Sequence, residues 1–150
     1  MNRSIVVMLV MLFSPLAVSA ADGMLSVESQ FNVETTVDRL EKMLAQKGMT
    51  IFNRVRHSES AGKVGIQLNE TQLIIFGNPK AGSPLMKCQQ TVAIDLPQKA
   101  LIRKDENNKV WISYNDIRYL VKRHGVQNCT KVISKIEKLL ANTTKSAASK

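Results

Sequence analysis

A glycine-flanked turn that carries a lysine and a serine is the segment of this chain best suited to bind a small molecule. The pair Ser83-Pro84 is typical of a helix start, because serine caps a helix and proline fits its first position. A helix N-terminus has unpaired N–H groups and the positive end of the dipole, which together favour an anion. A tight turn that only stabilises the fold also explains these residues. The candidate ligand-binding residues of the turn are Gly77, Asn78, Lys80, Gly82 and Ser83.

A second polar group follows a predicted strand and continues onto a predicted helix. Tyr119 and Arg123 are four residues apart and therefore lie on one helix face. We expect this group to line a polar pocket beside the Gly77 turn, although the tyrosines are equally suited to half-buried packing. Its candidate residues are Tyr114, Asn115, Tyr119 and Arg123.

Proton transfer is the third chemistry that the side chains allow. Asp95 is a candidate general base if it is desolvated, and His124 is a candidate proton carrier. An aspartate before Leu-Pro also commonly fixes a turn. No nucleophile motif accompanies these residues, so the sequence favours a binding or accessory protein and leaves catalysis as an alternative.

The soft-metal ligands of the chain are few. His57 and His124 are the only histidines, and with Met86 and the two cysteines they offer a copper-like ligand set. None of them has the spacing of a known metal motif, so we predict no cofactor and keep a metal-handling or redox protein as an alternative function. Cys88 and Cys129 are better explained as a disulfide, which would close a loop of about 40 residues and contribute about 4 kcal/mol.

The first twenty residues have the pattern of a secretory signal peptide. Arg3 precedes the apolar run Ile5–Phe13, and small residues surround Ser19 at a cleavage site. We therefore expect an exported protein, in the periplasm, whose mature chain has no membrane span. The predicted organisation is a signal peptide at 1–20, a single domain at 21–142 and a disordered Ser/Ala/Lys-rich tail at 143–150.

Positive charge is concentrated in the second half of the chain. Residues 21–97 contain eight basic and eight acidic residues, whereas residues 98–150 contain twelve basic and four acidic ones. This asymmetry indicates a surface that meets an anionic surface or a small anionic ligand, or else a solvated helix face. Because the chain is expected to be exported, nucleic acid is not a predicted partner.

Hydrophobic spacing predicts alternating strands and helices. Asn32 is suited to cap a helix that ends before Gly48, and the continuous apolar run Thr71–Phe76 indicates a strand buried on both faces. Further helices are expected from Ser83, at 116–124 and at 129–142. The amphipathic last helix is expected to pack on the sheet, with a homodimer contact or a lipid surface as alternatives. The expected strands are 24–31, 49–56, 71–76, 98–104 and 109–114.

This order and four motifs resemble the family called domain of unknown function 302. The resemblance covers roughly Leu25 to His124, with Ile117 where a proline is frequent and Arg103 where an aromatic residue is common. It implies no established reaction. The order of strands and helices predicts an α+β domain with helices packed on one face of a largely antiparallel sheet. The resemblance implies a fold similar to the TATA-box-binding-protein-like class. The motifs are IIFGNPKAGSPLM (74–86), AIDLP (93–97), KVWISYND (109–116) and Arg123-His124.

Overall fold

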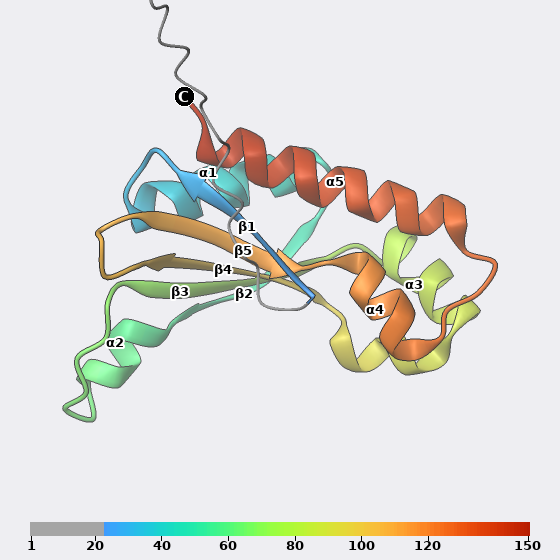
Figure 1. Cartoon of the computed structure of the whole chain (residues 1–150), viewed down its shortest axis with the longest axis horizontal. Helices are drawn as coiled ribbons and strands as arrows, with labels where there is room; N and C mark the ends of the chain where they lie inside the picture. The colour runs from blue at the N-terminus through green and yellow to red at the C-terminus, as the bar shows by residue number, and fades with distance from the viewer. Residues whose placement is uncertain (1–22) are drawn as a thin grey trace, which may run out of the picture.

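Five strands form a single antiparallel sheet in the computed structural model, which describes residues 23–150 (Figure 1). The spatial order is β1-β5-β4-β3-β2, so β2 to β5 form a meander and β1 pairs with the free side of β5. The predicted signal peptide lies outside the described residues. The strands are β1 (Met24–Ser29), β2 (Thr50–Arg56), β3 (Thr71–Gly77), β4 (Gln98–Lys104) and β5 (Val110–Asn115).

The sheet has one face covered by helices and one open face. In β3 the buried residues alternate as Gln72, Ile74 and Phe76, while Leu73 and Ile75 are only partly buried. The prediction that this strand is buried on both faces is therefore wrong, because the apolar residues of the open face have no layer packed over them. The predicted α+β class, with an antiparallel sheet and helices, is confirmed.

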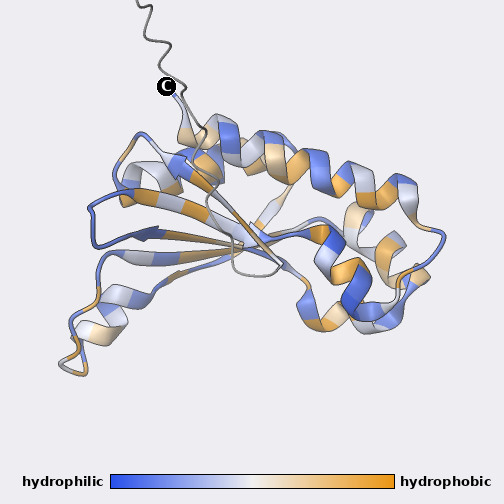
Figure 2. Cartoon of the chain, viewed as in Figure 1, coloured by the Kyte–Doolittle hydropathy of each residue, from blue (hydrophilic) through white to orange (hydrophobic). Residues whose placement is uncertain are grey.

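Two helices, α1 (Val33–Gln46) and α5 (Thr130–Ala148), lie on the same side of the sheet (Figure 1). Asn32 caps α1 as predicted, since its Oδ1 accepts the N–H of Thr35 at 2.8 Å. Gly48 follows the end of this helix with a φ of 73°, a conformation that glycine adopts without strain. Apolar residues face the sheet and hydrophilic ones face outward along α5 (Figure 2).

The tail at 143–150 is helical up to Ala148, so the prediction of disorder there is wrong. Thr143, Thr144 and Ala147 are buried, and the backbone carbonyl of Ala147 accepts Nε of Arg39 at 2.9 Å. The carbonyl of Ala148 accepts the backbone N–H of Gln30 at 2.9 Å. Composition predicted a solvated tail, but contacts with α1 and the end of β1 stabilise the last turns.

The remaining short elements lie at the two ends of the sheet (Figure 1). At one end, α2 (His57–Gly62) connects β2 to β3. At the other end, α3 (Pro79–Cys88), the 3₁₀ helix η1 (Gln90–Asp95) and α4 (Ile117–His124) pack against one another and against α5. Within residues 23–150, no helix combines the length and the apolar character needed to cross a membrane.

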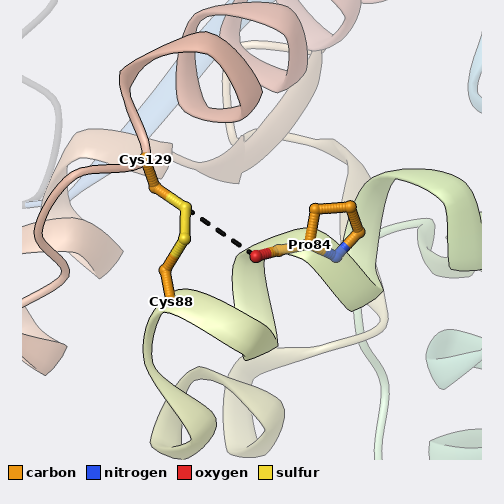
Figure 3. The surroundings of a disulfide bond; sticks show 3 residues. All are labelled: Pro84, Cys88 and Cys129. Carbon is orange, nitrogen blue, oxygen red and sulfur yellow. Dashed lines mark hydrogen bonds between the residues drawn. A yellow bond between two sulfur atoms is a disulfide. The ribbon is translucent and has the colours of Figure 1, made fainter.

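Cys88 and Cys129 lie at bonding distance, as the sequence predicted, with their Cα atoms 6.3 Å apart. Cys88 ends α3, and Cys129 immediately precedes α5 (Figure 3). Sγ of Cys129 also lies 3.7 Å from the carbonyl oxygen of Pro84, a van der Waals contact because a bonded sulfur carries no hydrogen. The pair therefore joins the two helices that meet at this end of the sheet.

Candidate functional site

Helix α3 begins five residues earlier than the Ser83-Pro84 pair predicts. Asn78 is the N-cap and Pro79 occupies the first position, while Pro84 lies inside the helix. Both pairs have the same local signal of a polar cap followed by proline. A tertiary contact accompanies the observed start, because Nδ2 of Asn78 donates to the carbonyl of Gly48 at 2.6 Å, at the end of α1.

The first N–H groups of α3 have partners within the turn itself. Oδ1 of Asn78 accepts the N–H of Lys80 at 2.8 Å, and its carbonyl accepts the N–H groups of Ala81 and Gly82 at 2.9 Å each. Pro79 has no N–H to offer. The free donors on which the predicted anion site depended are therefore absent from this turn.

A cavity of about 670 Å³ nevertheless opens beside the turn. It lies between the ends of β2 and β3, helix α3, the segment that leads into β4, and α5. Most of its wall is apolar, and much of it comes from elements far apart in the sequence. The larger apolar side chains of the wall are Phe52, Phe76, Met86, Leu96, Ile136 and Leu139.

Glycine at position 77 lies beside the Phe52 ring. A Cβ atom on Gly77 would lie 3.2 Å from Cε2 of Phe52, which is tighter than ordinary packing. Because the Phe52 ring is 55% exposed, a shift of a few tenths of an ångström would accommodate such an atom. Phe52 sits where the pairing of β2 with β3 shifts register, between Ile51 and Asn53.

The polar residues of the wall include cations and amides. Lys47, Lys80 and Lys135 line the cavity, and no aspartate or glutamate in the described range 23–150 does. Gln98 also lines it and is 9% exposed, and its Nε2 has no hydrogen-bond partner within residues 23–150. The cavity thus joins an apolar interior to a cationic border.

The two candidate proton carriers lie together, outside the cavity lining. Nε2 of His124 lies 2.6 Å from Oδ2 of Asp95, and its Nδ1 lies 3.1 Å from Oγ1 of Thr91. Arg123 contacts the other carboxylate oxygen of Asp95 at 3.2 Å. The His124 side chain is only 8% exposed, so this cluster joins the end of α4 to η1. Sequence reasoning named three of these residues, and Thr91 was missed because an isolated threonine carries no signal.

The structure separates the predicted ligand-binding residues into two groups. The five from the Gly77 turn line the cavity, as does Met86. Tyr114 is buried in the core, and burial raises the pKa of its hydroxyl. Asn115 pairs with Met24 at the edge between β5 and β1, and Tyr119 lies over Gly23. These three and Arg123 do not line the cavity.

The candidate metal ligands do not form a cluster. His57 begins α2 and His124 ends α4, at opposite ends of the sheet (Figure 1). Across the described range 23–150, no group of three or more His, Cys, Asp or Glu side chains is arranged to hold a metal ion.

Sequence reasoning missed the part of the site that α5 contributes. The local pattern predicts only an ordinary amphipathic helix and does not indicate a cavity around Lys135, Ile136 and Leu139. The cysteine pairing was the one available signal, since it brings the start of α5 to the end of α3.

Known proteins similar to this chain fall into two kinds. A solved structure of an uncharacterised conserved DUF302 protein from Bacillus stearothermophilus has a TM-score of 0.77 at 20% identity, covering 85% of this chain and 99% of that one. Two relatives carry the names fluoride-specific ion channel FluC 1, from Brucella suis, and FluC 2, from Brucella melitensis. Each is 39% identical over 114 residues, which is 76% of this chain.

The chain spans less than half the length of these channel relatives, 45% of the first and 42% of the second. The solved structure establishes likeness of fold alone. A family model, by contrast, matches residues 25–143, nearly the whole described domain. The chain belongs to the family described as domain of unknown function DUF302.

Proposed function

We propose that this domain is a small-molecule-binding module and that the cavity beside the Gly77 turn is its binding site. One observation carries the proposal: a mostly apolar cavity of about 670 Å³, with a few polar groups among its lining residues. Binding sites for small organic molecules typically measure about 300–1,000 Å³ and have this kind of lining. The described site therefore matches a drug-sized organic molecule better than a bare inorganic ion.

The elements around the cavity support a site that exists before the ligand arrives. Its walls come from a sheet end and from α3 and α5, and the Cys88–Cys129 pair joins these two helices. A preformed site avoids the entropic cost of ordering flexible loops on binding. Apolar surface of the ligand would replace water against the partly exposed side chains of Met86 and Leu139, which provides the driving force.

The relatives are consistent with an accessory role. Two of them are named fluoride-specific ion channels, and the similar stretch occupies less than half of each. The same fold covers 99% of the solved Bacillus chain, whereas the similar stretch is less than half of each channel relative. A domain that occurs both alone and within longer chains behaves as a self-contained unit. We infer that the domain supplies binding, and that any further activity of those channels belongs to the rest of their length.

Export is also part of the proposal. The first twenty residues have the signal-peptide pattern, and the Cys88–Cys129 pairing suits an oxidising compartment such as the periplasm. N-terminal sequencing of protein recovered from the periplasmic fraction should begin near Ala21. Recovery of uncleaved protein from the cytoplasm alone would contradict export and leave the binding site unaffected.

The binding site is tested with N-phenyl-1-naphthylamine, a neutral apolar dye that fluoresces in apolar surroundings. We expect saturable binding to the parent protein. Leu139→Trp should weaken dye binding by about tenfold or more, because the larger ring fills the cavity. Val132→Trp is the matched control, since Val132 lies two turns earlier on α5 and does not line the cavity. Equal binding by both variants, with both folded by circular dichroism, would place the dye elsewhere and overturn the proposal.

A further inference from the structure

Three lysines from three different elements surround the same cavity. Lys47 lies at the end of α1, Lys80 in the first turn of α3, and Lys135 on α5. They are separated by 33 and 55 residues in the sequence, so only the tertiary fold brings them together. In the part of the chain that the structure describes, no carboxylate lines the cavity to offset them.

These lysines differ from the cations that support the fold. Arg54, Arg118 and Lys109 each have a carboxylate within 3.1 Å. Within residues 23–150, the Nζ group of none of the three cavity lysines is in an ion pair or a hydrogen bond. Positive charges that line one cavity and lack a partner carboxylate favour the binding of an anion there.

We propose that the natural ligand is a single-chain amphiphile with an anionic head group. Its apolar chain lies along Phe76, Met86 and Leu139, and its head group lies among Lys47, Lys80 and Lys135. This inference rests on the proposed function and adds the chemical class of the ligand to it. It retains the anion that the sequence predicts at the Gly77 turn, but lysine side chains replace the helix amides as its partners.

The experiment compares three ligands with one chain length, each below its micelle concentration. Decanoate, decyl phosphate and decanol compete with N-phenyl-1-naphthylamine for the parent protein. Decanoate or decyl phosphate, or both, should bind about tenfold more tightly than decanol, because three exposed ion pairs each add a small amount. The two anions distinguish a free carboxylic acid from a lipid phosphate as the source of the head group.

Matched lysine variants locate the effect. The variant Lys47→Gln/Lys80→Gln/Lys135→Gln should lose the tenfold preference for the anion and keep its affinity for decanol. The control changes Lys42, Lys87 and Lys138 to glutamine, one on each of the same three helices and none at the cavity. The control has the same net charge and should keep the preference.

The possible outcomes distinguish the proposed binding site from the proposed anionic head group of its ligand. Equal affinity of the parent for all three ligands, with the dye still bound, would overturn the anionic head group and leave the binding site intact. Loss of the preference in both triple variants would show a general charge effect and overturn the lysine assignment. Absence of dye binding to the parent would remove the site itself.

Discussion

Two regions at the helix-covered face handle charge in opposite ways. In the first, which we call the Arg54 corner, α1 meets β2 and β3 through Arg54, Arg56, Glu34, Asp38 and Gln72. Nε of Arg54 donates to Oε1 of Gln72 at 2.7 Å and Nη1 to Oδ1 of Asp38 at 3.0 Å. Nη2 approaches Glu34 at 2.7 Å without hydrogen-bond alignment. The second region is the cavity end, where Lys47, Lys80 and Lys135 have no such partners among residues 23–150.

The comparison of the Arg54 corner with the cavity end shows which charges support the fold. The Arg54 side chain is only 17% exposed, and its carboxylate partners compensate for the lost water. The cavity lysines are exposed beside an apolar cavity, and within residues 23–150 they form no ion pair that holds α3 or α5. The cavity end is held by apolar packing and by Cys88–Cys129. The charged groups of the Arg54 corner therefore support the fold, whereas those of the cavity are available to bind a ligand.

The largest expected effect comes from the covalent link at the cavity end. The variant Cys88→Ser/Cys129→Ser should lose about 4 kcal/mol of unfolding free energy, because the pair closes a loop over a separation of 41 residues. Urea unfolding with and without reductant measures the loss in the parent, and the variant should not respond to reductant. An unchanged urea midpoint in the reduced parent would show that packing alone holds this end.

A smaller loss is expected at the Arg54 corner. Arg54→Met should cost about 2 kcal/mol, since Asp38 and Gln72 lose a charged partner while the apolar stem is retained. The loss should shrink in high salt, whereas that of the cysteine variant should not.

The triple glutamine variant at the cavity is the comparison, and its unfolding free energy should stay within about 0.5 kcal/mol of the parent. A loss at the cavity equal to that of Arg54→Met would erase the distinction between the two regions.

The smallest effect is a dependence on pH at the same corner. The hydrogen bond from Gln72, with help from Arg54, holds the pKa of Glu34 below its ordinary value of 4.5. A lowered pKa means that this stabilisation is complete above pH 4.5 and is lost as the pH falls through the folded-state pKa. Glu34→Gln should therefore flatten the acid side of the stability curve. Urea midpoints collected from pH 7 down to about pH 3 check this, and parallel curves for variant and parent would contradict it.

Local signals in the sequence predicted most of the elements correctly. The Asn32 cap and Gly48 set the bounds of α1. The expected strands 98–104 and 109–114 are also present, and Asp105 closes the turn between them, because its Oδ1 accepts the N–H groups of Asn107 and Lys109 at 2.9 Å each. Each of these signals depends on a few consecutive residues, because the hydrogen bonds of a cap or a turn form between near neighbours in the sequence.

Two errors show where prediction from neighbouring residues alone fails. The cap-and-proline signal occurs at both Asn78 and Ser83, and the observed helix start includes the bond from Asn78 to the distant carbonyl of Gly48. The tail after Asn142 looks disordered by composition, yet its small residues fit against α1, where Arg39 binds its carbonyls. In both cases the deciding partner is far away in the sequence.

Sequence alone determined the class of fold, the bounds of α1, the hairpin between β4 and β5, and the partners in the cysteine pair. Only the tertiary structure decided that the Gly77 turn borders an apolar cavity, and that α5 and β2 supply much of its wall. The physical reason is that a cap or a turn is satisfied by neighbours along the chain. A cavity, by contrast, is the space that distant side chains leave unfilled, and no local pattern specifies that space.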